Sequence, residues 1–199
     1  MVRQTLLVVA TTRDEHLLHL AGSMVRYAWQ GVRTVLVVVD DGVVNDSLLT
    51  MTRAATLLGV EQRFHWQAQP TISNRLARTF RAFQPQILLT TDSMVMLTLQ
   101  AWHQASDGSV SMPGLALLNG DKSSIWVPGG TSAMIEVPFT AGIRHALACL
   151  WAEGRYSIPE MRRRIAHQEW SAFEGFAWAG GAPVIHQTPI SDFFGIKTM

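Results

Sequence analysis

The sequence of 199 residues predicts an α/β fold built on a mostly parallel sheet. Two observations support this prediction. Short apolar runs rich in β-branched residues recur along the first half, and each is followed by a helical pattern with apolar residues at steps of three and four. The turns between these segments are short and polar, so strands and helices alternate. Strands joined through helices lie parallel, and the alternation therefore predicts a Rossmann-like three-layer sandwich.

Four strands are expected in the first half, near residues 5–10, 34–39, 61–66 and 86–91. The first run is apolar and β-rich, as expected of a parallel strand that is buried on both faces. The second has the same character and ends at Asp40-Asp41-Gly42, a turn signal. The third is interrupted by polar residues, which weakens its strand pattern.

Helices are expected between these strands, near residues 14–30, 46–58, 71–83 and 92–105. Gly31 and Gly59 follow the first two helices and are typical of helix C-termini. Pro85 follows the third helix and cannot continue it. Asp46 or Ser47 can cap the second helix.

The pattern changes after Ser106. Short strands are expected near 115–118, 124–127 and 133–137, helices over 138–153 and 159–170, and late strands at 173–178 and 183–186. The sequence therefore predicts a single domain over 1–199, with a Rossmann-like half at 1–106. An α+β elaboration at 107–199 is expected to pack on this half.

Composition limits the classes of partner. Charged residues make up 16% of the chain, which is low, and the seven tryptophans include several outside the apolar runs. This combination favours an apolar surface that is covered by self-association, so a homo-oligomer is expected. The net charge of +1 argues against a nucleic-acid partner. Cys149 is the only cysteine, which excludes an intramolecular disulfide and a cysteine zinc cluster.

The N-terminal residues lack the apolar core and the cleavage site of a signal peptide. No apolar run approaches the roughly 18 residues that a transmembrane helix requires. The sequence therefore predicts a cytoplasmic protein with no membrane partner.

The polar corner after the first strand is the first candidate site. Thr11-Thr12-Arg13 ends the strand, and Asp14 and Glu15 then place two carboxylates in the first turn of a helix, where the helix dipole stabilises negative charge. Ligands of open α/β sheets bind beyond the carboxyl ends of strands, so this corner is the expected site. The alternative is that these residues only cap the helix, and the corner alone favours capping.

Several segments in order carry a resemblance to one family. Residues 10–23 align with A-H-P-D-D-E-x-L-G-x-G-G-T, without a gap if the family's Pro-His-Pro matches Thr11-Thr12-Arg13. Residues 53–60 are similar to E-A-x-x-L-G-V, 83–90 to R-P-D-V-V-x-T, 173–176 to A-E-A-F and 191–195 to D-L-F-G. These are motifs of the LmbE/PIG-L superfamily of zinc-dependent de-N-acetylases, which act on N-acetylglucosamine-containing and related substrates. The resemblance covers nearly the whole chain and implies an LmbE/PIG-L-like fold.

The resemblance also assigns site positions. Hydrolysis of an amide needs a metal to activate water and a base, and a catalytic zinc ion needs about three protein ligands. By position, Asp14 matches the family's base and Glu15 its carboxylate ligand, whereas Thr12 stands where the first His ligand should be. In the later H-P-D-H motif Asp92 matches the Asp, and Ser93 replaces the ligating His. Glu15 is thus the only retained ligand, and no metal or other cofactor is expected.

His16 and His19 follow this corner in the sequence. Together with Arg13 they are expected to line the site. The two histidines lie three positions apart in the sequence and therefore share one face of the helix. The favoured interpretation is a solvent-facing polar stripe that continues through Ser23; the alternative is a rebuilt metal site. They replace a Glu and a Gly of the family, so their bulk is expected to fill the old site. Two methionines, Met94 and Met96, are expected to pack beside it.

Three functions remain open. The favoured one is a degenerate family member without the zinc-dependent activity, acting as a binding or assembly protein. The second is an active hydrolase, an N-deacetylase of an N-acetyl sugar or related amide, with a rebuilt site and with zinc as its cofactor. The third is a non-catalytic binder of a sugar or nucleotide-sugar in the old cleft. A small molecule such as a sugar derivative is the expected ligand.

Overall fold

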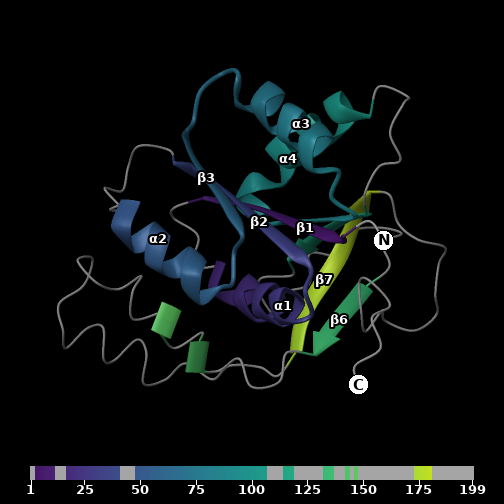
Figure 1. Cartoon of the computed structure of the whole chain (residues 1–199). Coiled ribbons are helices and arrows are strands. Elements are labelled where there is room, and N and C mark those ends of the chain that lie inside the picture. Colours follow the sequence, from purple (N-terminus) through teal and green to yellow (C-terminus); the bar gives the residue numbers. More distant parts are fainter. Residues whose placement is uncertain are drawn as a thin grey trace.

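The computed structural model describes residues 3–11, 17–40, 48–106, 114–118, 132–136, 142–143, 146–147 and 173–180. At its centre lies a seven-stranded sheet with the strand order β3-β2-β1-β4-β5-β7-β6 (Figure 1). The strand bounds are β1 (Thr5–Thr11), β2 (Arg33–Asp40), β3 (Gln62–Gln67), β4 (Ile87–Thr90), β5 (Gly114–Leu118), β6 (Ser132–Glu136) and β7 (Phe173–Gly180). The first five strands are parallel, and β7 and β6 add two antiparallel pairings at one edge.

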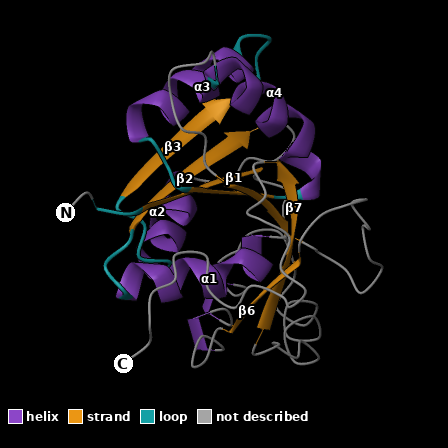
Figure 2. Ribbon diagram, turned by 90° about the vertical axis from the view of Figure 1, so that its right-hand side faces the viewer, coloured by secondary structure: helices purple, strands orange, loops and turns teal. Residues whose placement is uncertain are grey.

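The helices form a layer on each face of this sheet (Figures 1 and 2). Their bounds are α1 (Leu17–Trp29), α2 (Leu48–Leu57), α3 (Ile72–Phe83), the 3₁₀ turn η1 (Asp92–Met94) and α4 (Val95–Ala105). Helices α1 and α2 cover one face, and α3 and α4 cover the other. Parallel strands that are covered on both faces are the expected result of helical crossovers.

Strand β1 is the middle one of the five parallel strands, and its sequence suits a position with helices on both faces. All seven are buried, and the apolar side chains alternate between the two faces. Leu6 and Val8 pack with α1 and α2, whereas Leu7 and Val9 pack with α3 and α4. Burial of an aliphatic side chain contributes about 1.5–3 kcal/mol, so β1 supports both halves of the core.

Strand β3 forms at the sheet edge although polar residues interrupt it. Its Phe64 ring lies 5.5 Å from the Trp66 ring and 5.8 Å from the Phe83 ring, which joins the strand to the end of α3. The other side chains of β3 are largely exposed. One apolar face is sufficient for an edge strand, and the prediction of a strand here is confirmed.

The helix ends follow from backbone conformation. Gly31 and Gly59 have φ values of 81° and 66°, in the left-handed region that glycine adopts without strain. In each case the glycine and the residue after it donate amide hydrogen bonds back into the last helical turn, as in a Schellman motif. At Gly59 a Cβ atom would lie 2.8 Å from the Ala28 Cβ, so the close approach of α1 also requires glycine.

The described elements agree with the α/β prediction, and the first-half elements lie within a few residues of their expected bounds. One side chain of the predicted polar stripe is an exception, because Ser23 is fully buried. In addition to the sheet, Leu147 and Ile143, from helical residues far along the chain, pack against the cluster that contains α1. Helix α1 is therefore covered over a wider arc than the sheet alone would cover.

The second half extends the sheet, since β5 pairs with β4 and β7 pairs with β5. The predictions at 115–118, 133–137 and 173–178 correspond to β5, β6 and β7. Those at 124–127, 159–170 and 183–186 lie outside the described residues. Among the described residues, no helix is both long enough and apolar enough to cross a membrane.

Candidate functional site at the carboxyl ends of β1 and β4

The topology brings together the carboxyl ends of the two strands that precede the predicted parts of the site. Strands β1 and β4 are parallel neighbours, with Val9 opposite Thr90, so their carboxyl ends lie at the same end of the sheet. Residues 12–16 follow β1 directly, and residues 91–93 follow β4. In open α/β sheets this end is where ligands bind. The prediction of a shared location therefore agrees with the strand pairing.

Several predicted site residues lie beyond what the structure describes. Thr12, Arg13, Asp14, Glu15 and His16 fall between the described ranges 3–11 and 17–40. Their roles therefore stay predictions.

Three further predicted residues lie inside described ranges. For His19 in α1 and Asp92 in η1 the description covers the backbone alone. Only Ser93 is described with its side chain.

Two hydroxyl side chains in the turn after β4 contact each other. The Thr91 Oγ1 and Ser93 Oγ atoms lie 3.1 Å apart, within hydrogen-bond distance. The Met94 amide donates to the Thr91 carbonyl at 2.9 Å, which closes the turn. Zinc sites in proteins use thiolate, imidazole and carboxylate ligands. The described hydroxyls of this turn therefore do not fit a zinc ion, and we derive no chemical step through one.

Beneath this turn, Thr90 connects three elements. Its Oγ1 donates to the Val9 carbonyl of β1 at 3.1 Å and lies 3.1 Å from the Thr98 Oγ1 of α4. Because its one hydrogen goes to Val9, Thr98 is the donor to Thr90. Both threonines are fully buried, so these bonds satisfy polar groups that water does not reach.

The two methionines near the turn differ. Met94 is 5% exposed and belongs to the core under α3 and α4, as predicted. Met96 is 75% exposed, so the prediction that it packs beside the site is wrong. Met96 lies two residues after Met94, in the first turn of α4, and its side chain projects away from the sheet.

The end of β2 carries a pair that sequence analysis missed. The Asp40 Oδ2 lies 3.6 Å from the His65 Nε2, across the β2–β3 pairing that places Val38 opposite His65. The sequence signals were an aspartate at the end of the second strand and a histidine in the third strand. The register between the two strands was needed to bring these residues together. Within the described ranges no group of three or more His, Cys, Asp or Glu residues could hold a metal ion.

The fold is similar to three solved structures at low sequence identity. N,N'-diacetylchitobiose deacetylase from Pyrococcus horikoshii, in complex with its inhibitor MPG, matches with a TM-score of 0.65 and 13% identity over 92% of this chain and 88% of that one. The conserved protein TT1542 from Thermus thermophilus matches with a TM-score of 0.61 and 16% identity over 91% and 96%. GalB, the 4-carboxy-2-hydroxymuconate hydratase from Pseudomonas putida, matches with a TM-score of 0.58 and 14% identity over 93% and 99%.

No protein-family model matches the sequence, and no curated protein matches it. The likeness to the solved structures covers most of each chain and confirms the predicted LmbE/PIG-L-like fold. One of these similar proteins is a deacetylase and another is a hydratase. The fold therefore occurs with two different reactions, and the reaction has to be argued from side chains.

Proposed function

We propose that this chain is a divergent LmbE/PIG-L protein that does not carry out the family's zinc-dependent de-N-acetylation and acts as a binding or assembly protein. The observation that carries the proposal is the hydroxyl pair after β4, where Ser93 bonds to Thr91 at the position of a family His ligand. At the other strand end, the resemblance places Thr12 where the family has its first His ligand.

The electrostatics of the described turn support the same proposal. A hydroxyl pair whose hydrogen bond is internal to the turn carries no charge. Removal of water from a divalent cation has to be offset by ligands with negative charge or strong lone pairs. Of the three carboxylates in the predicted site, the resemblance makes only Glu15 a metal ligand, and one ligand is too few.

The assembly part of the proposal rests on the surface. In the described part of the chain, Trp29 is 67% exposed and Met96 is 75% exposed, at the end of α1 and the start of α4. Only 16% of the residues in the whole sequence are charged, so little charge repulsion opposes the association of two copies through apolar surface. A second copy of this chain is the proposed partner.

Zinc analysis of protein purified without chelator tests the proposal, with Glu15→Ala as the matched variant. We expect no stoichiometric zinc in either protein, even after zinc is added and the sample is desalted. We also expect no acetate release from N,N'-diacetylchitobiose. The result that would overturn the proposal is one zinc ion per chain that is lost in Glu15→Ala, together with acetate release. That result would establish the rebuilt hydrolase.

Calorimetry with the same sugar separates the remaining alternatives. Saturable binding without hydrolysis would show that the old cleft still binds a sugar. No binding, together with a concentration-dependent dimer in sedimentation experiments, would support the assembly role.

A further inference from the structure

Strand β3 ends the sheet, and no described strand pairs with its outer edge. Backbone groups of successive residues point alternately to the two edges of a strand. The Ala68 amide, just after β3, donates to the Asp40 carbonyl of β2 at 2.6 Å, so the even-numbered residues of β3 face β2. The Glu61 amide also faces β2, but Glu61 lies in the bend before the strand. The amides and carbonyls of Arg63 and His65 therefore face outward.

This outer edge is accessible. His65 is exposed as a residue although its side chain is only 27% exposed, so much of its exposed surface is main chain. Arg63 is also exposed. In the described part of the chain, the outward backbone groups of these two residues have no protein partner. Such an edge is a template for pairing with another strand.

The edge is complementary to a second copy of itself. Two β3 strands that pair antiparallel have to match outward residues with outward residues. The register centred on Phe64 does so, because it places Arg63 opposite His65 of the second copy and Phe64 on the two-fold axis. The same contact then occurs twice, as a two-fold interface requires.

Charge favours this register. Side chains alternate between the two faces of a strand, so Arg63 and His65 share the face opposite Phe64 and Trp66, which pack with α3. The Asp40 Oδ2 lies 3.6 Å from the His65 Nε2. Arg63 of the second copy therefore arrives beside a carboxylate. A shift of the axis by one residue toward Arg63 would instead set the two arginines against each other.

The other face of the pair is apolar. Phe64 is only half-buried within one copy, where it contacts the core under α3. Residues on the axis of this register form a non-hydrogen-bonded pair, in which opposite side chains approach closely. The two Phe64 rings would therefore cover each other, and aromatic pairs of this kind stabilise a sheet.

We infer that two copies of this chain associate through β3, joined antiparallel about an axis at Phe64 into one continuous sheet. The inference rests on the proposed function, because it gives the proposed self-association a surface. That surface does not include Trp29 or Met96, which lie on α1 and α4.

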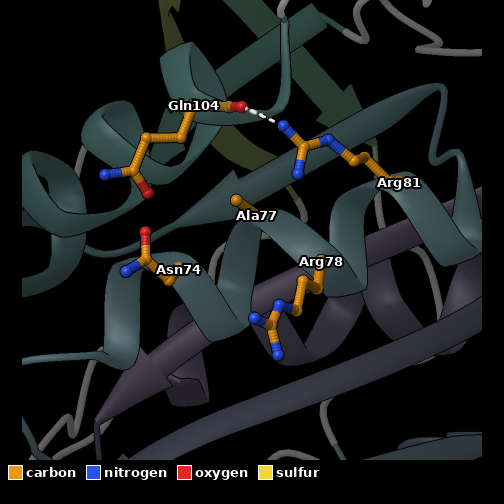
Figure 3. A pocket seen from close by; sticks show the side chains of 5 residues that line it. All are labelled: Asn74, Ala77, Arg78, Arg81 and Gln104. Atoms are coloured by element: carbon orange, nitrogen blue, oxygen red, sulfur yellow. Dashed lines mark hydrogen bonds between the residues drawn. The ribbon is translucent and has the colours of Figure 1, made fainter.

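Arg78 provides a matched control because it is an exposed arginine on another surface. It lines a pocket of about 460 Å³ between α3 and α4, with Arg81 and Gln104 among the other lining residues (Figure 3). There the Arg81 guanidinium donates a hydrogen bond to the Gln104 carbonyl. No residue of β3 lines this pocket.

Sedimentation velocity of the full chain over a range of concentrations measures the dimer. We expect Arg63→Glu to weaken it by roughly tenfold or more, because the new carboxylate faces Asp40 of the second copy. Arg78→Glu makes the same change of charge and should leave the dimer unchanged. Arg63→Glu/His65→Lys restores opposite charges across the axis and should recover the dimer.

Cross-linking tests the register. Residues of a non-hydrogen-bonded pair have Cα atoms about 4.5 Å apart, within the range of a disulfide. Phe64→Cys should therefore give a disulfide-linked dimer under mild oxidation. Gln67→Cys should give none beyond the parent protein, because its two copies would lie about 20 Å apart.

Three results would overturn the inference. A monomer at every concentration would remove the assembly part of the proposed function as well. A dimer that Trp29→Ala dissociates and Arg63→Glu does not would keep self-association and exclude β3. Cross-linking of Gln67→Cys as readily as Phe64→Cys would exclude this register. Zinc content is measured separately and does not depend on these outcomes, and matching circular dichroism spectra ensure that a lost dimer is not a lost fold.

Discussion

The turn after β4 and the pocket between α3 and α4 lie close along the chain but differ in chemistry. The turn is at the carboxyl end of a parallel strand, where open α/β sheets bind ligands, and its described polar groups are two hydroxyls bonded to each other. The pocket is on the outer surface of two helices and carries two arginines with no acidic residue in either helix. Location in a fold and chemical capacity are therefore separate properties, and each has to be argued from its own observations.

The largest expected effect is on metal binding at the strand ends. The double variant Thr12→His/Ser93→His puts imidazoles at the two family ligand positions that lack them, so that with Glu15 the three ligand positions implied by the resemblance are filled. We expect about one zinc ion per chain to remain after desalting, against none for the parent protein. Thr12→Ala/Ser93→Ala is the control and should bind none. Zinc bound by the histidine variant after Glu15→Ala is added would show that the ion sits elsewhere.

The second prediction compares two methionines at the start of α4. Met94→Ala removes a buried side chain and leaves a cavity, so the free energy of unfolding should fall by about 2–4 kcal/mol. Met96→Ala changes an exposed side chain and should alter it by less than about 0.5 kcal/mol. Urea unfolding measures both. Equal effects would contradict the burial that distinguishes the two residues.

The third prediction concerns the hydroxyl pair beneath the turn. Thr90→Val and Thr98→Val each leave a buried polar group without its partner, so each should lower the free energy of unfolding by about 1–2 kcal/mol. The double variant removes both partners and should cost less than the sum of the single variants. Additive effects in the same denaturation experiment would mean that the two hydroxyls do not interact.

The smallest expected effect is on the stability of the α3–α4 contact. Arg81→Gln removes the bond to the Gln104 carbonyl and should lower the free energy of unfolding by about 0.5–1 kcal/mol. Arg78→Gln removes a charge that the pocket lining leaves exposed, and the change should stay within about 0.5 kcal/mol. A larger loss of unfolding free energy for Arg78→Gln than for Arg81→Gln would contradict this assignment of the structural role to Arg81.

Much of the parallel sheet could be predicted from sequence because strands that are buried on both faces consist of continuous apolar runs. The run in β1 is apolar at nearly every position, as a strand between two helical layers requires. The glycines after α1 and α2 mark helix ends by their backbone conformation alone. These are local signals, and local signals can be read in sequence.

Features that depend on distant contacts could not be predicted in the same way. Ser23 is fully buried, and residues near 147 pack on the α1 cluster, but neither fact is indicated by the sequence near Ser23. The Asp40–His65 pair needs the register of β2 against β3. The arginine spacing in α3 was visible, but the approach of Gln104 from α4 was not.

The central place of β1 also has a consequence for biosynthesis. One edge of β1 is paired by β2, but the other waits for β4: Thr90 bonds to Val9 across 81 positions of the chain. The Thr5 amide likewise donates to the Gln86 Oε1 at 2.7 Å. Until these residues leave the ribosome, a fully buried strand of the sheet presents an open edge, which is a template for aggregation. Translation that pauses before β4 therefore exposes this chain to misassembly, and a fragment ending there should be insoluble.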